Sequence, residues 1–405
     1  MPSAFDVGQF RAQFPIFEKP FGVYLDTGAT SLTPQIVSDA ICKYYCHERA
    51  TVGRSAYRAA IKAANQVAKA REDLSRHINL PPGHVLVFCQ GATAALNLLP
   101  LAYPWQPGDN VVITLLEHNA NLLPWMNLRQ KGVELRIAQP EPDGNIRAKA
   151  ITDLFDKNTR FVSFTHISNV LGTSPPVEEV CAAARRRGIY SVIDGAQSFG
   201  HMPIDLAALG CDAFAASAHK AFGPTGIGFL TLSDRLQERV TSPILGGGMV
   251  ESVDLNGFIA KAPPAGWEPG TPNISGIIAW GESLPVLKQA ITPAAMDYVE
   301  GLLEEMHDGL TAIPGVNVFG PPKPPRHSSV VSWTLDGMGA HRVGSSLDEL
   351  FGVMVRAGHH CAMLVHRVML RQLRGTVRAS LAPYNTHDEV KALIDAVIKF
   401  KGVLA

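Results

Sequence analysis

Residues 190–230, which read YSVIDGAQSFGHMPIDLAALGCDAFAASAHKAFGPTGIGFL, decide the fold of this chain. The apolar run at the start predicts a β-strand that ends at Asp194, and a run of small residues, 213–216, predicts a second strand that leads into Lys220. Open α/β sheets bind ligands at the carboxyl ends of their strands. We therefore expect Asp194 and Lys220 to face one crevice.

A carboxylate opposite a lysine suits the chemistry of pyridoxal phosphate. The acid keeps the pyridine nitrogen of that cofactor protonated, so that the ring accepts electrons, and the amine carries the aldehyde. The alternative is a buried ion pair between Asp194 and Lys220 that closes a strand end without any ligand. These two residues alone leave both interpretations open.

Composition narrows the classes of protein to consider. The 405 residues favour two domains over one, and a content of 46% hydrophobic and 18% charged residues predicts a sizeable core. A formal net charge of +0, from 36 basic and 36 acidic residues, indicates neither nucleic acid nor an anionic membrane as a partner. No apolar stretch has the length of a signal peptide or a membrane span, and 6 cysteines make no disulfide framework in a chain of this size. We expect a cytoplasmic protein.

A strand, a glycine turn and a helix follow one another at residues 84–98. The apolar run 84–89 leads into Gly91, Ala92 and Thr93, after which a helix begins. Free N–H groups at the start of a helix bind phosphate, although such turns also occur without a ligand. Strands and helices continue to alternate up to about residue 232, which predicts a largely parallel sheet wrapped by helices.

The chain changes character after about residue 284. A long helix, two strands and a last helix with the capping box Thr386 and Glu389 predict a smaller α+β domain. This domain would carry the candidate cysteine and the candidate substrate-binding arginine. We predict a large α/β domain at residues 21–285 and a small α+β domain made of residues 1–20 and 286–405.

Short motifs, in order along nearly the whole chain, resemble the class V aminotransferase family of pyridoxal phosphate enzymes. Within that family they look like the SufS/CsdA-type (group II) cysteine desulfurases, a branch that includes selenocysteine lyases. Each motif is moderately specific, and the set in this order is far more specific. The motifs are Glu117-His118-x-Ala120-Asn121, Ser168-Asn169-Val170-Leu171-Gly172-Thr173, Asp194-Gly195-Ala196-Gln197, Ser217-x-His219-Lys220, Gly246-Gly247-Gly248, Gly270-Thr271-Pro272-Asn273, Arg356-x-Gly358-His359-His360-Cys361-Ala362 and Val377-Arg378-Ala379-Ser380.

The resemblance implies a homodimer with fold type I of the pyridoxal phosphate enzymes, the aspartate aminotransferase-like fold. It implies that Lys220 binds the cofactor covalently, that Asp194 pairs with the pyridinium nitrogen and that His118 stacks on the ring. Gln197 would hydrogen-bond the ring hydroxyl. The expected cofactor-binding residues are Ala92, Thr93, His118, Asn169, Asp194, Gln197, Ser217, His219, Lys220 and, from a second subunit, Thr271, and the expected substrate-binding residues are Asn169, Arg356 and Arg378.

Cys361 is the candidate nucleophile, and Lys220 and His118 are the other candidate catalytic residues. Cys361 follows Gly358-His359-His360 in a predicted turn, where exposure and nearby cationic groups would favour the thiolate. A desulfurase needs a thiolate that takes sulfur from the substrate, while Lys220 removes the Cα proton. The alternatives for Cys361 are a thiol without function and a His-His-Cys metal site, for which no fourth ligand is evident; we expect no metal.

Several departures from the family pattern concern the substrate mouth and the acceptor surface. Asn119 stands where many relatives carry a second histidine, and Tyr57 ends a run in which this branch commonly has a histidine. Ala92 replaces one threonine of the phosphate turn, which removes a hydroxyl but no backbone donor. Residues 265–268 and 363–366 also differ from the usual runs. These changes leave cofactor binding intact and make the identity of the substrate less definite.

The resemblance implies conversion of L-cysteine to L-alanine with a persulfide on Cys361. The sulfur would pass to an acceptor protein for iron–sulfur cluster assembly or other sulfur biosynthesis. One alternative is a selenocysteine lyase, or another pyridoxal phosphate-dependent C–S lyase, aminotransferase or epimerase of the same fold, in which Cys361 is not essential. A second alternative is a non-catalytic binding subunit, against which the intact Lys220, Asp194 and Arg378 argue.

Overall fold

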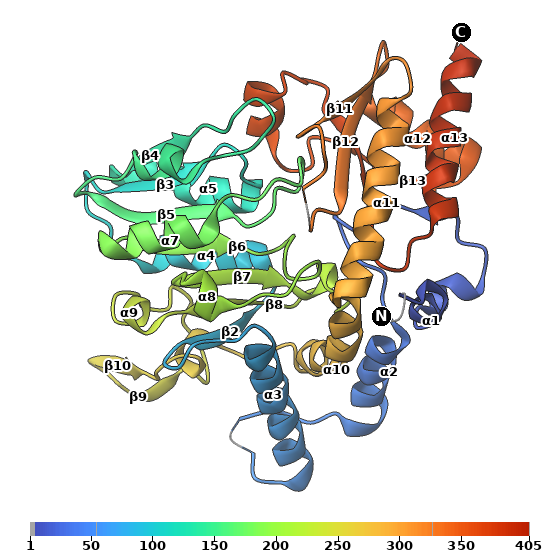
Figure 1. Cartoon of the computed structure of the whole chain (residues 1–405). Helices are drawn as coiled ribbons and strands as arrows, with labels where there is room; N and C mark the ends of the chain where they lie inside the picture. The colour runs from blue at the N-terminus through green and yellow to red at the C-terminus, as the bar shows by residue number, and fades with distance from the viewer. Residues whose placement is uncertain (1–4, 54, 326, 405) are drawn as a thin grey trace.

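The computed structural model describes residues 5–53, 55–325 and 327–404. A seven-stranded sheet forms the centre of its larger part (Figure 1). The strand order is β2-β8-β7-β6-β5-β3-β4, in which the strands from β7 to β4 run parallel and β8 is antiparallel to both of its neighbours. The predicted α/β fold with a mainly parallel sheet is therefore confirmed. The strands are β2 (Val85–Cys89), β3 (Asn110–Thr114), β4 (Glu134–Ala138), β5 (Thr159–Thr165), β6 (Tyr190–Asp194), β7 (Ala213–Ser217) and β8 (Gly228–Leu232).

Helices pack on this sheet because its central strands are apolar on both sides. Every residue of β3 and of β7 is buried, as expected of parallel strands covered on both faces. Helix α7 (Val177–Arg186) shows how the sequence fits this role, since Val177, Val180, Cys181 and Ala184 recur at helical spacing and are all buried. The other helices of this part are α2 (Gln35–Lys43), α3 (Arg58–His77), α4 (Ala92–Ala102), α5 (Asn119–Asn127), α6 (Ala148–Thr152), α8 (Leu206–Leu209), α9 (Asp234–Gln237) and α10 (Ile274–Ala290).

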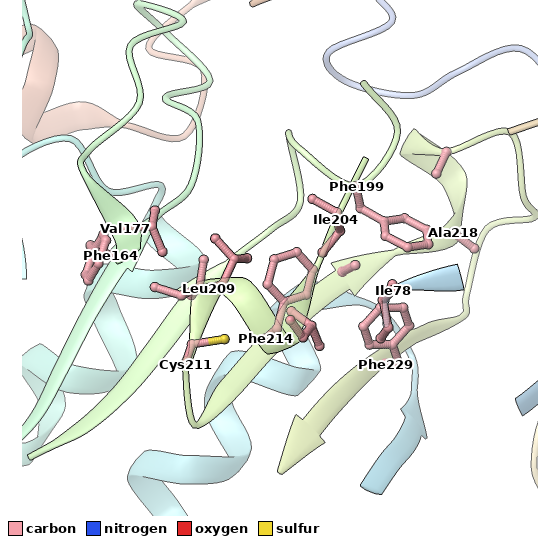
Figure 2. Packing of buried hydrophobic residues seen from close by; sticks show 14 of the residues in the cluster. Ile78, Phe164, Val177, Phe199, Ile204, Leu209, Cys211, Phe214, Ala218 and Phe229 are labelled. Carbon is pink, nitrogen blue, oxygen red and sulfur yellow. The ribbon is translucent and has the colours of Figure 1, made fainter. Parts of the chain in front are cut away.

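The hydrophobic core reaches up to the carboxyl ends of β6 and β7 (Figure 2). Phe229 stacks on Trp280 with ring centroids 5.3 Å apart, and Phe214 lies beside Phe229 in the same cluster. A Cβ atom on Gly195 would lie 1.9 Å from Cζ of Phe214, so only glycine fits there. The core thus fixes the path of the chain immediately after Asp194.

A second, antiparallel sheet of four strands forms the smaller part, with the order β11-β12-β15-β14. Helices α11, α12 and α13 contribute apolar residues to its hydrophobic cluster, which is separate from the cluster around Phe214. The predicted capping box is present: Glu389 N donates to Thr386 Oγ1 and Thr386 N donates to Glu389 Oε2, each at 3.2 Å. These elements are β11 (Val316–Phe319), β12 (Val330–Leu335), β14 (Arg356–Gly358), β15 (Thr376–Ser380), α11 (Pro293–Thr311), α12 (Ala340–Phe351) and α13 (His387–Leu404).

The start of the chain packs where the two parts meet. The Phe14 ring lies 5.8 Å from the Phe222 ring and 5.1 Å from the Tyr384 ring, so it contacts both halves of the sequence. After α1 (Val7–Arg11), strand β1 (Val23–Tyr24) pairs in parallel with β13 (Val353–Met354). The division into residues 21–285 and residues 1–20 with 286–405 stays a prediction, and residues 1–4 of it lie outside the described residues.

A hairpin of β9 (Val250–Asp254) and β10 (Gly257–Ala260) lies apart from both larger sheets. Its side chains other than Val250 are exposed, including Val253, Leu255 and Phe258. In the part of the chain that the structure describes, no helix has both the length and the apolar character needed to cross a membrane.

Candidate active site

A cavity of about 230 Å³ lies at the carboxyl ends of β5, β6 and β7. It brings together residues that the sequence analysis took from segments far apart in the chain. Thr271 is the exception: it is exposed and does not line this cavity. The predicted residues that line the cavity are Ala92, Thr93, His118, Asn169, Asp194, Gln197, Ser217, His219, Lys220, Arg356, Cys361 and Arg378.

Asp194 and Lys220 reach the cavity from adjacent strands. Asp194 is the last residue of β6, and Lys220 ends the 3₁₀ turn Ala218–Lys220 that follows β7. Burial raises the pKa of Asp194, while the N–H of Ala196, 3.0 Å from Oδ1, and the charge of Lys220 oppose that shift. Burial lowers the pKa of Lys220 to about 8, and Asp194 opposes this shift. The cavity therefore holds an amine that loses its proton more readily than an ordinary lysine.

The predicted anion site is a tight turn between β2 and α4. Gly91 has φ +144°, which favours glycine, and a Cβ atom on Gly228 would lie 2.5 Å from Cα of Gly91. These two glycines let the turn lie directly against β8. Ala92 N donates to Ser217 Oγ at 2.7 Å, so the start of α4 and the end of β7 are joined within the cavity.

His118 caps the start of α5 and is neutral at pH 7. Ala120 N donates to Nδ1 of His118 at 3.0 Å, so the proton of the neutral ring lies on Nε2. Burial lowers the pKa of His118 to about 4, with smaller contributions from the positive charges of Lys220 and of Arg378 and Arg356. The ring therefore offers an N–H group and a flat apolar face to the cavity.

Arg378 is 2% exposed and lines the cavity together with Arg356 and Asn169. We call the part of the cavity lined by these three residues the arginine end. Its Nη1 donates to the Asn169 carbonyl at 3.0 Å and its Nη2 to Asp26 Oδ1 at 3.1 Å. Its Nε–H has no hydrogen-bond partner among the described residues, although it is buried. Arg356 Nη1 lies 3.6 Å from Asp26 Oδ2. One carboxylate thus faces two guanidinium groups, which leaves a net positive charge for an anion.

Cys361 lies in a left-handed segment between β14 and a π-helical turn, Val365–Met369. Asn169 Nδ2 donates to the His360 carbonyl at 2.7 Å, and Asn119 N donates to the Cys361 carbonyl at 2.6 Å. Asn119 acts here through its backbone, which a histidine would supply equally well. Cys361 is exposed and also lines an outer cleft of about 530 Å³ between α4 and α5.

Other predicted residues also have partners of their own. Gln197 Nε2 donates to the Gly28 carbonyl at 2.8 Å, which leaves its Oε1 as the free end of the amide. His219 Nδ1 lies 3.3 Å from Thr30 Oγ1. Of the remaining cysteines, none lines this cavity within the described residues, and no group of three or more His, Cys, Asp or Glu side chains there could hold a metal.

No sequence pattern pointed to the residues that surround the Arg378 guanidinium or to those that lie beneath His118. Asp26 lies two residues after β1, a position at a strand end that resembles the position of Asp194 at the end of β6. A Cβ atom on Gly28 would lie 3.1 Å from Cζ of Arg378, so the guanidinium rests on a bare backbone. Beneath His118, Glu117 accepts hydrogen bonds from the Asn121 amide at 2.6 Å and from Thr165 N at 3.1 Å, while burial raises its pKa to about 8.

Comparison with known proteins shows the family. The family model Aminotransferase class-V matches residues 23–393. The chain belongs to that family. A cysteine desulfurase of Salmonella dublin is 36% identical over 411 residues, which cover 99% of each chain. The predicted family membership is therefore confirmed.

Solved structures agree with this assignment. The apo structure of a cysteine desulfurase from Thermococcus onnurineus NA1 has a TM-score of 0.92 and 32% identity, covering 99% of this chain and 100% of that one. The cysteine desulfurase CsdA (S-sulfonic acid) from Escherichia coli has a TM-score of 0.90 and 32% identity with the same coverage. The likeness thus includes both the large and the small sheet.

Proposed function

We propose that this chain is a pyridoxal phosphate-dependent cysteine desulfurase, which converts L-cysteine to L-alanine and takes the sulfur as a persulfide on Cys361. One observation carries the proposal. A single cavity holds the pair Asp194 and Lys220, a buried arginine with an unpartnered N–H group, and an exposed cysteine. The names of the relatives support the same activity.

The residues present fit the cofactor. A buried acid, an amine with a lowered pKa and the first N–H groups of a helix are the groups that its ring nitrogen, aldehyde and phosphate require. When bound, the cofactor supplies a sink for the electrons of the substrate Cα. Lys220 would hold it covalently, Asp194 would pair with its ring nitrogen, Gln197 with its ring hydroxyl and His118 with its face, and Ala92, Thr93, Ser217, His219 and Thr271 of a second copy would hold the phosphate.

The arginine end receives the substrate carboxylate. Arg378, Asn169 and Arg356 all line that part of the cavity, and the buried Nε–H of Arg378 has no partner among the described residues. A guanidinium binds a carboxylate through two parallel N–H groups, so this contact also orients the substrate. Lys220 Nζ then takes the Cα proton, a role that a pKa of about 8 suits at neutral pH.

Cys361 performs the sulfur transfer. Its Sγ forms a bond to the substrate sulfur while the Cβ–S bond of the substrate breaks. The electron pair of that bond stays with carbon, which gains a proton, and the product leaves as alanine. One cysteine thiol and one L-cysteine thus give one persulfide and one L-alanine, with no other reactant.

Cys361→Ser tests this proposal. The variant should remain yellow and should still change its absorbance when L-cysteine is added, because the cofactor contacts are untouched. It should release almost no alanine and carry no persulfide, both measured by mass spectrometry. Cys42→Ser, at an exposed thiol outside the cavity, is the matched control and should behave as wild type.

Full alanine production by Cys361→Ser would favour the alternatives, a C–S lyase or another enzyme of this fold in which the cysteine is not essential. Parallel assays with L-selenocysteine separate a selenocysteine lyase, which would keep activity on the selenium substrate without Cys361. A chain that binds the cofactor and turns over neither substrate would be a binding subunit.

The proposal extends to the assembly, the partners and the location. Thr271 is exposed and does not line the cavity of its own chain, and the hairpin β9–β10 exposes Leu255, Phe258 and Ile259. Both observations support a homodimer in which Thr271 serves the neighbouring site. The short interval from Arg356 to Cys361 and the exposure of Cys361 support direct transfer of its sulfur to an acceptor protein, for iron–sulfur cluster assembly or other sulfur biosynthesis. We propose that this takes place in the cytoplasm. Light scattering of the purified protein would show the dimer, and labelled sulfur would identify the acceptor.

A further inference from the structure

Two histidines on either side of Cys361 share a single hydroxyl group. His360 Nε2 lies 2.9 Å from Thr376 Oγ1, and His366 Nε2 lies 3.1 Å from the same oxygen. Thr376 and His366 are fully buried, and His360 is 4% exposed. The three side chains therefore form a hydrogen-bonded chain that solvent does not reach.

The position of each proton in this chain follows from its ends. His366 Nδ1 lies 3.0 Å from the Ala362 carbonyl, which only accepts, so Nδ1 carries a proton. Burial lowers the pKa of His366, so the ring is neutral at pH 7 and its Nε2 carries no proton. Thr376 must then donate its one proton to His366 Nε2, and its oxygen accepts from Nε2–H of His360. The neutral His360 ring therefore carries its proton on Nε2 and none on Nδ1, and Nδ1 has no hydrogen-bond partner among the described residues.

The hydrogen-bonded chain of these three side chains lies beside a strained backbone segment, His360–Cys361. His360 has φ +49° and Cys361 has φ +55°, a region that costs a residue with a side chain about 1–2 kcal/mol. Asn169 and Asn119 hold the two carbonyl groups of the segment from the side of the large sheet. The two histidine rings tie the segment to β15 of the small sheet through Thr376, which pairs with Gly358 in the β14–β15 ladder. Such strain persists where the surroundings over-determine it.

We infer that Thr376 is a positioning residue for Cys361: its hydroxyl fixes the orientation of His360 and His366, and so keeps Cys361 in the left-handed conformation from which its sulfur faces the cavity. Thr376 touches neither cofactor nor substrate in this role. The inference rests on the proposed function for its effect on sulfur transfer. His366 lies in the run 363–366 that departs from the family pattern, so the arrangement is a property of this chain's own residues.

Thr376→Val tests the inference, with Thr376→Ser as the matched control. Valine keeps the branched shape but removes the hydroxyl, whereas serine keeps the hydroxyl. The single-turnover rate of persulfide formation on Cys361, followed by mass spectrometry, should fall roughly tenfold in the valine variant, the scale of two neutral hydrogen bonds, and stay near wild type in the serine variant. The affinity for L-alanine, measured by cofactor absorbance, should be unchanged in both, because Arg378 and Lys220 are untouched.

A second measurement reads the tautomers directly. Nitrogen-15 spectra of histidine-labelled protein should show His366 protonated on Nδ1 and His360 protonated on Nε2, with the signals assigned by their loss in His366→Gln and His360→Gln. Glutamine at position 366 offers an oxygen to Thr376 and should keep most of the persulfide rate, whereas His366→Leu should lose it. This pair replaces the Thr376 pair if the valine variant does not fold.

The inference is overturned if the valine and serine variants form persulfide at equal rates, if the valine variant loses affinity for L-alanine to the same extent as rate, or if either histidine shows the opposite tautomer. A different result would show that the proposed function is wrong and would leave the inference about Thr376 testable. In that case wild type itself forms no persulfide, while the tautomers and the rate of Cys361 alkylation by iodoacetamide still report on Thr376.

Discussion

Asp194 and Lys220 reach the cavity from the ends of two hydrogen-bonded strands of the large sheet, whereas Cys361 reaches it from a left-handed loop beside the small sheet. Asp194 and Lys220 form what we call the strand-end half of the site, and Cys361 and its neighbours form the cysteine half. The hydrophobic core holds the strand-end half in place, since Phe214 packs against Gly195. The cysteine half is held by hydrogen bonds to distant segments, from Asn119, Asn169 and Thr376.

The strand-end residues are positioned by the sheet and its core, whereas Cys361 is positioned by a few individual hydrogen bonds. A strand end in a packed sheet has few alternative places, because the ladder and the core fix it together. A loop in an unfavourable backbone region keeps its place only while each contact is intact. Single substitutions around Cys361 should therefore change sulfur transfer while cofactor binding survives, and substitutions at the strand ends should affect both.

Lys220→Ala gives the largest expected effect and tests the strand-end half. It removes both the covalent attachment of the cofactor and the amine that moves the Cα proton, so kcat should fall by about 10²–10⁴. Borohydride reduction followed by peptide mapping should label the Lys220 peptide in wild type and in the exposed control Lys62→Ala, but no lysine in Lys220→Ala. Label on another lysine would show that the strand ends do not carry the cofactor.

The same difference explains what the sequence could predict. The runs that end at Asp194 and Lys220 are local patterns, so their meeting at one sheet edge followed from general rules of α/β folds. Cys361 was found only through its motif, and its left-handed conformation depends on Asn169, which lies 191 residues from His360 in the chain. The pairing of Asp26 with Arg378, 352 residues apart, has the same cause. No local pattern encodes contacts between parts of the chain that meet only after folding.

Arg378→Ala has the next largest effect and acts where the two halves meet. Arg378 contacts Asn169 of the large part and Asp26 at the start of the chain, and it lines the cavity. Removing one member of a buried charged pair should cost about 2–5 kcal/mol, seen as a lower kcat/KM for L-cysteine and weaker binding of L-alanine. Arg378→Lys should recover only part, since an ammonium lacks the planar fork. A wild-type kcat/KM in Arg378→Ala would place the carboxylate elsewhere.

The pH dependence of cofactor uptake tests the lowered pKa of Lys220. Its amine must be neutral to attack the aldehyde, and burial lowers the pKa of Lys220 to about 8 from the ordinary 10.5. The neutral fraction therefore rises with pH, so the rate at which apo protein takes up pyridoxal phosphate should increase with a midpoint near pH 8 and level off by about pH 9. Asp194→Asn removes the opposing charge and should move the midpoint to lower pH. A rate that still rises above pH 9 would mean that Lys220 is solvated like an ordinary lysine.

Thr386→Ala has the smallest expected effect. It tests whether a loss of stability in the smaller α+β part, away from Cys361, changes sulfur transfer. Thr386 and Glu389 cap α13, and Glu389 also accepts from Asn385 at 2.9 Å and pairs with Arg11 at 2.7 Å. Loss of the threonine hydroxyl removes the side-chain acceptor of Glu389 N, which keeps only the Thr386 carbonyl at 3.1 Å, so the free energy of unfolding should fall by about 0.5–2 kcal/mol. Thr386→Ser should restore it. Neither change touches the segment around Cys361, so the persulfide rate below the unfolding temperature should match wild type. A lower rate in Thr386→Ala at full folding would show that the cysteine loop is coupled to the whole small sheet, and not only to Thr376, Asn119 and Asn169.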